Sequence, residues 1–348
     1  MGTKDFFNFP YPAFYLKNNS LFILDQTKLP NEISYLEVKE LKDLVKAIKE
    51  LKVRGAPLLG IIVGFGIYFL SLKIRDNLKE NLLFSINELK NTRPTARNLF
   101  YVLETLEKII KKEDNNKRLK AKIKKIVFDF YEKEKKSFLK IAQNGNRLIP
   151  KKANILTICN TGHLATGGIG TALGVIFYAG KLGKDLKVYI CETRPLLQGA
   201  RLTTFEILNS PFKNIKPILI TDNMVGAIME QIDLVLVGAD RIALNGDTAN
   251  KIGTKTLALC AHYFKKPFYV ACPISTIDQN IKNGKEIKIE ERSCEEIKKI
   301  RNYLIAPKEI DCYNPAFDIT ENSLITAIIT EKRIIYPPFE KNIKKLII

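Results

Sequence analysis

The sequence predicts an α/β protein in which a mainly helical N-terminal domain precedes a Rossmann-like parallel-sheet domain. Up to about residue 143 most apolar residues recur at helical spacing, whereas short apolar runs rich in β-branched residues dominate the second half. Segments long enough for crossover helices separate these runs, as in a parallel sheet. A chain of 348 residues also exceeds the usual size of one hydrophobic core. We therefore expect two domains, at residues 1–145 and 146–348, divided at the turn-rich Asn144–Asn146.

In the first domain, Phe14–Asp25 is expected to form a small hairpin or an edge strand. Helical spacing then predicts helices at Leu36–Leu51, Pro57–Lys73, Leu78–Leu89, Thr95–Lys111 and Arg118–Gln143. The most apolar stretch, Gly55–Leu72, only just reaches the length of a membrane span, about 18 to 20 residues. Its proline and glycines favour a closely packed internal helix. Met1–Tyr15 lacks the continuous apolar core of a signal peptide, so we expect a cytoplasmic protein with no membrane partner.

In the second domain, the length and β-branched content of the apolar runs are typical of buried parallel strands. These strands are expected at Asn154–Ile158, Val188–Cys191, Pro217–Ile220, Asp233–Gly238 and Phe268–Cys272. Polar groups follow four of them directly, at Cys159–Gly162, Glu192–Pro195, Asp222–Asn223 and Gly238–Arg241. A turn explains any one of these groups. Because ligands of open α/β sheets bind beyond the carboxyl ends of the strands, the four groups together indicate an enzyme.

The formal charge of +19 suggests nucleic-acid binding at first sight. Between Lys108 and Lys152 there are 16 Lys or Arg residues and 5 Asp or Glu residues, but the apolar residues among them keep helical spacing. A solvated helix face explains this pattern better than a nucleic-acid partner. The six cysteines form no CxxC pair and show no metal-ligand spacing, which favours buried thiols in a reducing compartment and no metal site.

Six motifs in one order resemble those of the family that contains methylthioribose-1-phosphate isomerase, ribose-1,5-bisphosphate isomerase and the regulatory subunits of the exchange factor for translation initiation. The motifs are Val53–Pro57, Arg93–Leu99, Cys159–Gly162, Glu192–Thr203, Gly238–Gly253 and Asn314–Asp318. The first two, and the run Asn245–Gly253, are most similar to the methylthioribose-1-phosphate branch. Two positions depart from it, Ile158 where many members have His, and His163 where a small residue is usual. A lone His favours a loop or supporting role over ligand contact.

The resemblance implies an isomerase that converts 5-methylthioribose 1-phosphate to 5-methylthioribulose 1-phosphate in methionine salvage, with 5-deoxyribose 1-phosphate as an additional substrate. It also implies a homodimer that needs no cofactor. One alternative is ribose-1,5-bisphosphate isomerase, which would need a second anion site. The other is a non-catalytic regulatory subunit that binds initiation factor or nucleotide. The presence of both Cys159 and Asp240 argues against that second alternative.

Two residues are candidates for the chemistry. An aldose 1-phosphate cannot open its ring by losing a hemiacetal proton, because its anomeric oxygen carries the phosphate, so an acid must protonate the ring oxygen. Asp240 follows a strand among apolar neighbours that would raise its pKa, and the resemblance implies the same acid role. Cys159 begins a glycine-rich turn whose backbone amides can stabilise a thiolate or an anionic intermediate. The family uses this thiol as a base or as a transition-state stabiliser, and hydrogen moves from C2 to C1 either as a proton or as a hydride.

The substrate phosphate needs cationic and amide donors. The resemblance implies that substrate is bound by Arg54, Gly55, Ala56, Arg97, Gln198, Asn250 and Lys251. An interdomain salt bridge is the alternative role of either arginine. Because these residues come from both domains, the site is expected between them, where closure could exclude water. The methylthio group should then enter an apolar pocket lined near Tyr11–Tyr15 or Leu58–Ile61.

Overall fold

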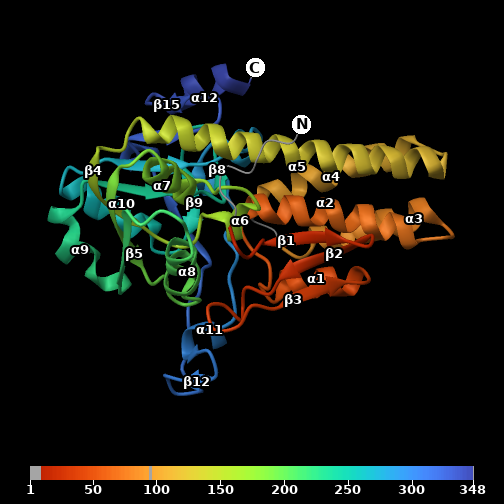
Figure 1. Ribbon diagram of the computed structural model, residues 1–348, viewed down its shortest axis with the longest axis horizontal. Coiled ribbons are helices and arrows are strands. Elements are labelled where there is room, and N and C mark those ends of the chain that lie inside the picture. Colours follow the sequence, from red (N-terminus) through yellow and green to blue (C-terminus); the bar gives the residue numbers. More distant parts are fainter. Residues whose placement is uncertain (1–8, 94–95, 348) are drawn as a thin grey trace.

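The computed structural model describes residues 9–93 and 96–347. Helices of the N-terminal half form one end of the elongated molecule, and the large sheet with its covering helices forms the other (Figure 1). Helix α5 (Asn116–Asn146) runs along both parts. The predicted fold class, a helical N-terminal region followed by a mainly parallel sheet, is confirmed.

The N-terminal half starts with a small antiparallel sheet of β1 (Phe14–Lys17), β2 (Ser20–Leu24) and β3 (Tyr35–Val38). The expected hairpin is therefore present. The helix predicted from Leu36 was wrong in its first turn, because Leu36 pairs with Ile23 of β2 and Glu40 caps a helix that begins only at Leu41. The helices of this half are α1 (Leu41–Lys49), α2 (Ala56–Lys73), α3 (Leu78–Lys90), α4 (Arg97–Lys112) and α5.

Helix α2 is the core of this half. By length and composition it could cross a membrane, but every residue from Ala56 to Ser71 is buried inside the protein. It packs on α3, α4 and α5, as expected for an internal helix. Its start is fixed by Gly55, whose φ of +93° favours glycine and where an added Cβ would lie 2.4 Å from the carbonyl oxygen of Ala165. The first turn of α2 is therefore held against the loop that follows the first strand of the large sheet.

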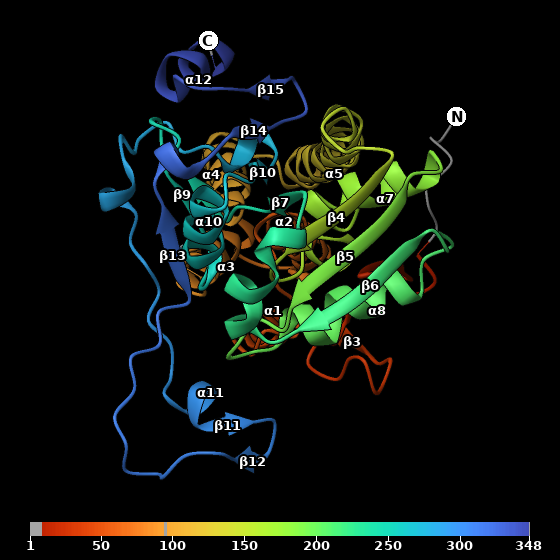
Figure 2. The same ribbon diagram turned by 90° about the vertical axis from the view of Figure 1, so that its left-hand side faces the viewer.

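The large sheet has the order β15-β14-β10-β7-β4-β5-β6, with β15 antiparallel at one edge and all other pairs parallel (Figure 2). Its strands are β4 (Lys152–Thr157), β5 (Asp185–Cys191), β6 (Ile215–Ile220), β7 (Leu234–Val237), β10 (Phe268–Ala271), β14 (Ala327–Ile329) and β15 (Ile334–Ile335). The five predicted strands are confirmed, with ends that differ by three residues at most. Apolar residues such as Ile155, Val235 and Val270 fill both faces of the sheet.

A second, antiparallel sheet was not predicted. It consists of β8 (Arg241–Ile242), β9 (Thr248–Lys251) and β13 (Phe317–Thr320), in the order β13-β9-β8. β9 brings Asn250 and Lys251 beside the chain that leaves β7. Apart from short 3-10 helices, the remaining elements are α6 (His163–Thr166), α7 (Ala172–Lys181), the π-helix η1 (Gly199–Thr203), α8 (Thr204–Leu208), α9 (Val225–Ile228), α10 (Thr254–Tyr263), α11 (Glu295–Lys298), β11 (Lys299–Ile300), β12 (Tyr303–Leu304) and α12 (Phe339–Ile347).

Helix α5 does not end where a turn was expected. It continues through Asn144–Asn146, and the chain turns only at Arg147. Its second half packs on α7, and Phe138 and Ile141 belong to the apolar core of the sheet. The turn signal was overridden because this segment buries its apolar face against the other half. The division of the chain at residues 145 and 146 stays a prediction.

Candidate active site

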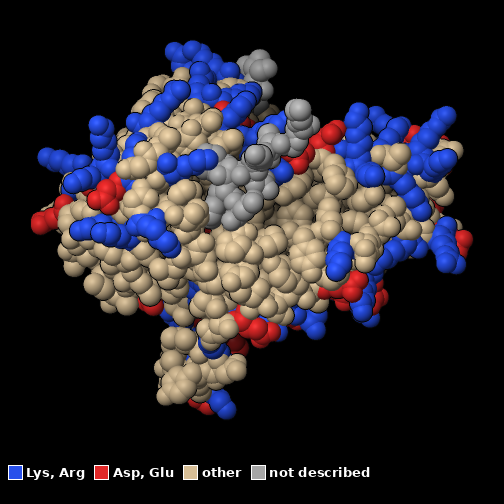
Figure 3. All heavy atoms as spheres, in the orientation of Figure 1, with Lys and Arg blue, Asp and Glu red and all other residues tan. Residues whose placement is uncertain are grey.

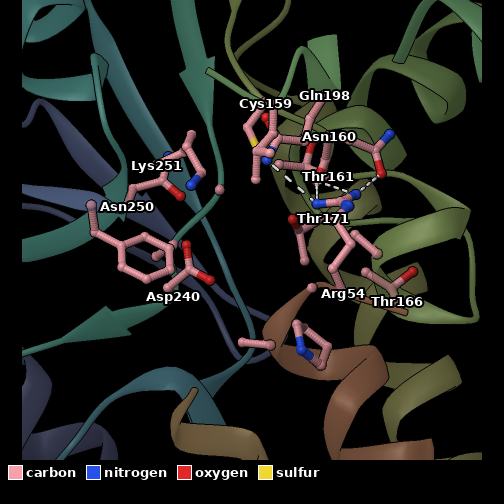
Figure 4. A pocket seen from close by; sticks show the side chains of 18 of the residues that line it. Arg54, Cys159, Asn160, Thr161, Thr166, Thr171, Gln198, Asp240, Asn250 and Lys251 are labelled. Carbon is pink, nitrogen blue, oxygen red and sulfur yellow. Dashed lines mark hydrogen bonds between the residues drawn. The ribbon is translucent and has the colours of Figure 1, made fainter. Parts of the chain in front are cut away.

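A cavity lies between the two halves of the chain at the carboxyl ends of β4, β5 and β7. Arg54, Cys159 and Asn160 lie on one side of it, and Asp240, Asn250 and Lys251 lie on the other (Figure 4). The lining residues are Leu51, Arg54, Gly55, Ala56, Pro57, Arg93, Cys159, Asn160, Thr161, Ala165, Thr166, Thr171, Leu196, Gln198, Gly238, Ala239, Asp240, Asn250, Lys251, Arg292 and Phe317. The structure thus brings together every predicted site residue except Arg97.

The backbone of Cys159 is held by the side-chain hydroxyls of two threonines. Its amide donates to the hydroxyl oxygen of Thr193 over 2.9 Å, and its carbonyl accepts from the hydroxyl of Thr203 over 2.6 Å. Asp222, beyond β6, in turn accepts the amide of Thr193 over 2.8 Å. The polar groups after β5 and β6 therefore support the turn at Cys159, whose φ of +64° such bonds stabilise.

Arg54 is anchored by Asn160. Both terminal nitrogens of its guanidinium donate to the Asn160 backbone carbonyl, over 3.1 and 3.2 Å, and Nη2 also donates to the side-chain Oδ1. Nη1 lies 3.9 Å from the sulfur of Cys159. Nε is buried without a hydrogen-bond partner among residues 9–93 and 96–347. The cation of Arg54 is thus fixed beside the thiol.

The opposite side of the cavity carries charges of both signs. Burial raises the pKa of Asp240, although Lys251 and Arg93 oppose that shift. Burial likewise lowers the pKa of Lys251, opposed by Cys159 and Asp240. The Lys251 ammonium donates to the Ala316 carbonyl over 2.8 Å and lies 4.8 Å from the ring centre of Phe317. Both groups are therefore shifted toward their neutral forms, which suits groups that exchange protons.

Gln198 and the start of α2 supply uncharged donors and acceptors. Gln198 is buried, and in the described part of the chain its Oε1 has no hydrogen-bond partner. Gly55 and Ala56 line the cavity where α2 begins, and a helix start leaves amides such as theirs without an intrahelical partner. Asn250 donates its amide to the Thr254 hydroxyl over 3.0 Å.

The position of Arg97 corrects its assignment to substrate binding. Its guanidinium lies within 3.7 Å of both Glu104 and Asp278 and does not line the cavity. Arg93 lines it instead. Nε of Arg93 donates to Glu290 over 3.1 Å, while its buried Nη1 has no hydrogen-bond partner among the described residues.

Of the two arginines in one motif, the structure places Arg93 at the cavity and not Arg97, the one expected there. Both arginines belong to Arg93–Leu99, of which Pro94 and Thr95 lie outside the described residues. Arg97 is the first residue of α4, whereas Arg93 precedes that helix in the loop. The place of Arg93 in a loop was the available signal, because loop residues can reach a cleft that a helix face cannot.

His163 supports the loop around the cavity. Its Nε2 accepts the amide of Ala13 over 3.0 Å, so Nδ1 carries the proton that is shared with the Gly168 carbonyl at 2.9 Å. The loop role expected for it is confirmed.

The five other cysteines do not line the cavity. Burial raises the pKa of Cys191 and of Cys272 well above the ordinary thiol value. Among the described residues no three His, Cys, Asp or Glu side chains are grouped closely enough to hold a metal ion.

A second, outer pocket adjoins the cavity and shares Leu51, Arg54, Leu196, Gln198 and Arg292 with it. Cations surround it, at Lys49, Arg201, Arg292, Lys299 and Arg301. Several already have partners, since Arg292 pairs with Glu290 and Glu296, and Lys299 pairs with Glu295.

The apolar lining expected from Tyr11–Tyr15 or Leu58–Ile61 comes from other residues. Neither of these described segments lines the cavity, whose apolar surface is supplied by Leu51, Pro57, Leu196 and Phe317. Leu58–Ile61 belong to a helix that is buried on every side, so the residues after its first turn face the helical core and have no access to the cleft.

Comparisons with known proteins agree with this architecture. The sequence pattern described as the initiation factor 2 subunit family matches residues 52–337. The methylthioribose-1-phosphate isomerase of Caldicellulosiruptor saccharolyticus is 50% identical, over 96% of this chain and 98% of the relative. That of Thermotoga neapolitana is 49% identical, over 94% and 96%.

Two solved structures are similar over nearly the whole chain. The 5-methylthioribose 1-phosphate isomerase of Pyrococcus horikoshii OT3 has a TM-score of 0.86 and 38% identity, and covers 97% of this chain and 95% of its own. The translation initiation factor eIF-2B, subunit delta, from A. fulgidus has a TM-score of 0.83 and 39% identity, with 96% and 98% covered. With a sequence pattern that spans most of its length and relatives near half identity, the chain belongs to the initiation factor 2 subunit family.

Proposed function

We propose that this protein is a sugar-phosphate isomerase that converts 5-methylthioribose 1-phosphate to 5-methylthioribulose 1-phosphate, a step of methionine salvage, with 5-deoxyribose 1-phosphate as an additional substrate. The observation that carries the proposal is the pairing of Cys159 with Asp240 across one cavity that is also lined by cations and by the start of a helix. Relatives that are about half identical over nearly their whole length carry this activity in their names.

The phosphate is held at the start of α2. Helix N-termini attract anions because their first amides have no intrahelical partner. Arg93 adds a buried Nη1 that lacks a partner in the described part of the chain, and Lys251 adds a buried ammonium. A phosphate oxygen would satisfy that nitrogen by a charge-assisted hydrogen bond. Arg54 contributes its fixed positive charge from the other side of the cavity, and Gln198 offers a carbonyl oxygen to a sugar hydroxyl.

Asp240 opens the ring. The raised pKa of its carboxyl, which burial causes, keeps a larger protonated fraction near neutral pH than an exposed Asp would have. The proton passes to the ring oxygen as the C1–O bond to the ring breaks, and this leaves an open-chain aldehyde equivalent at C1. Hydrogen then moves from C2 to C1, and the C2 hydroxyl gives up its proton, which restores the acid form of Asp240, so C2 is oxidised to the ketone and C1 is reduced with no outside oxidant.

Cys159 lies where that hydrogen transfer needs assistance. As a thiolate near Arg54 it can take the C2 proton and return it to C1, or it can stabilise the charge that develops during a hydride shift. Lys251 completes the electrostatic surroundings of the reacting carbons, because a cation stabilises an enediolate or a ketone oxygen.

The protein acts in the cytoplasm as a homodimer, with a small-molecule sugar phosphate as its partner and no part for nucleic acid or membrane. On the face that Figure 3 shows, the Lys and Arg side chains are spread over both ends of the molecule instead of forming one stripe, which supports the exclusion of nucleic acid. The cavity between residues of the two predicted domains, 1–145 and 146–348, also gives domain closure a means of excluding water.

One observation favours ribose-1,5-bisphosphate isomerase as a second candidate. In the outer pocket, Lys49, Arg201 and Arg301 lie beside the cavity, and Nε of Arg201 is buried without a partner among the described residues. These cations could receive a 5-phosphate. The similarity to named methylthioribose-1-phosphate isomerases favours the first candidate.

A turnover assay with the two substrates tests the proposal. Purified protein is incubated with 5-methylthioribose 1-phosphate or with ribose 1,5-bisphosphate, and the ketose product is followed by NMR. We expect turnover of the methylthio sugar with kcat/KM at least about 100-fold above that of the bisphosphate, since a 5-phosphate would have to lose its hydration in a cavity with an apolar lining. Preference for the bisphosphate would establish the second candidate, and turnover of neither would favour a regulatory subunit.

A further inference from the structure

We propose that Glu206 is a positioning residue, which fixes the amide of Asn160 so that Asn160 in turn holds the guanidinium of Arg54 in the cavity. The role of Arg54 toward substrate rests on the proposed function. Glu206 itself does not line the cavity and acts on it only through Asn160.

The hydrogen bonds of Glu206 define one orientation of Asn160. Glu206 is fully buried on α8. Its Oε1 accepts the Leu164 amide over 3.0 Å, and its Oε2 accepts a bond from Nδ2 of Asn160. In its ionised form the carboxyl is an acceptor only, so the nitrogen of the Asn160 amide faces it. The oxygen Oδ1 must then face Arg54, where it accepts from Nη2.

A second contact supports the same orientation. Nδ2 of Asn160 lies 3.2 Å from the hydroxyl oxygen of Thr203. That hydroxyl donates its hydrogen to the Cys159 carbonyl over 2.6 Å, so its oxygen is free to accept from Asn160. The absence of a side chain at Gly162 makes room for the carboxylate, since an added Cβ there would lie 2.4 Å from Oε2.

A buried acid in this place needs an explanation. Burial raises the pKa of Glu206 to about 7, and the bonds from Asn160 and Leu164 oppose that rise. A buried carboxyl that made no useful contact would be replaced at little cost by an apolar group. Here it supplies two acceptors to loops on either side of the cavity turn, which no apolar side chain can do.

Replacing Glu206 by Gln changes one acceptor into a donor at almost constant shape. The oxygen of the introduced amide must accept from Leu164, so its nitrogen faces Nδ2 of Asn160, and two donors meet. The Asn160 amide relieves this contact by flipping, which turns its nitrogen toward the guanidinium of Arg54. The double variant Glu206→Gln with Asn160→Asp restores the pattern, because the carboxylate introduced at position 160 accepts from both neighbours and the total charge is unchanged.

The test compares the wild type, Glu206→Gln, the double variant and Glu134→Gln. Glu134 is a matched control, because it is a buried carboxyl on α5 whose Oε2 has no partner in the described part of the chain and which does not line the cavity. In Glu206→Gln we expect KM for 5-methylthioribose 1-phosphate to rise about 10- to 100-fold, the usual loss for one hydrogen bond to a charged group, with kcat changed less than about 5-fold. The double variant should recover to within about 5-fold of the wild type. The control should stay within about 2-fold.

A fall in kcat at unchanged KM in Glu206→Gln would indicate a loss of folded enzyme and would overturn the positioning role. A double variant no better than Glu206→Gln would overturn it as well. Crystal structures of the wild type and of Glu206→Gln provide a measurement that is independent of turnover. If the wild type does not isomerise the sugar, the proposed function fails, and the position of Arg54 in the two crystal structures alone decides the inference. It stands if Arg54 leaves Asn160 in the variant, and it fails if Arg54 is unmoved.

Discussion

The two sides of the cavity differ in how their polar groups are satisfied. On one side, which we call the anchored wall, Arg54, Cys159 and Asn160 are held by bonds from the protein itself. On the other, the charged wall, Arg93, Asp240 and Lys251 bring opposite charges together out of water. Each wall has one buried donor without a partner among the described residues, Nε of Arg54 and Nη1 of Arg93, but both terminal nitrogens of Arg54 already donate to Asn160, whereas Nη1 is a terminal nitrogen of Arg93.

This difference separates two tasks of one active site. Groups whose positions the fold already fixes stabilise a transition state without moving, because the free-energy cost of orienting them was met when the protein folded. Groups whose pKa values burial has moved toward neutrality can give or take a proton at ordinary pH. Activity should therefore be sensitive to small displacements of the side chains on the anchored wall. On the charged wall, activity should be sensitive to the loss of a group that can give or take a proton. Substitutions on each wall test this difference.

The largest effect is expected from Asp240→Asn on the charged wall. The amide keeps the shape of the carboxyl but cannot supply a proton, so kcat should fall by about 10²- to 10⁴-fold. Affinity for the product, measured by calorimetry, should change less than about 5-fold. If the folded variant turned over at a near-normal rate, Asp240 would have no part in the chemistry.

On the anchored wall, Cys159→Ser should lower kcat by about 100-fold, because an alcohol ionises far less readily than a thiol. The control is Cys260→Ser, which removes a thiol from α10 at a position outside the cavity. That variant should keep kcat within about 2-fold. Equal losses in the two variants would show that thiol removal acts through stability, a possibility that thermal unfolding of both would check.

Substitution of the two arginines of one motif should change the affinity for the product to different extents. Arg93→Ala removes the cation with the unpartnered Nη1, so product affinity measured by calorimetry should fall about 10- to 100-fold. Arg97→Ala breaks ion pairs with Glu104 and Asp278 at 3.7 Å and should leave that affinity within about 3-fold. The reverse result would restore Arg97 to the substrate site and remove Arg93 from it.

The smallest effect on activity, and a clear one on stability, is expected from Glu134→Gln, outside both walls. Burial, with Glu331 adding to it, raises the pKa of Glu134 to about 8 from an ordinary 4.5. The folded state therefore holds its proton more tightly, so the unfolding free energy of the wild type falls as pH rises from about 4.5 to 8. Each pKa unit corresponds to about 1.4 kcal/mol.

Glu134→Gln lacks that titration, so its stability relative to the wild type should improve by a few kcal/mol between about pH 4.5 and about pH 9. Urea unfolding at both pH values measures the change. A relative stability that is the same at both would show that Glu134 ionises in the folded state as readily as an exposed Glu.

Much of this site could be predicted from sequence, because the carboxyl ends of parallel strands are where apolar runs give way to polar residues. Cys159 and Asp240 were found in this way. The antiparallel strands that bring Asn250 and Lys251 to the cavity were not found, since β8 and β9 are short and follow no clear alternation. Their place in the site rested on the family resemblance.

The supporting residues were beyond sequence reasoning for a different reason. Glu206 lies 46 residues from Asn160 in the chain, and nothing local distinguishes it from a surface Glu on a helix. The two arginines of the motif could not be separated either, because only the start of α4 decides which of them reaches the cavity. Distances across the fold are set by tertiary packing, which local patterns do not encode.

The most direct test of the two-wall account is a crystal structure of Asp240→Asn with 5-methylthioribose 1-phosphate, which this variant should bind without converting. The account predicts the phosphate at the amides of Gly55 and Ala56, within hydrogen-bond distance of Nη1 of Arg93, with the sugar ring between Cys159 and the amide introduced at position 240. A phosphate bound instead among Arg201 and Arg301 in the outer pocket, with the Arg93 nitrogen still unpartnered, would contradict it.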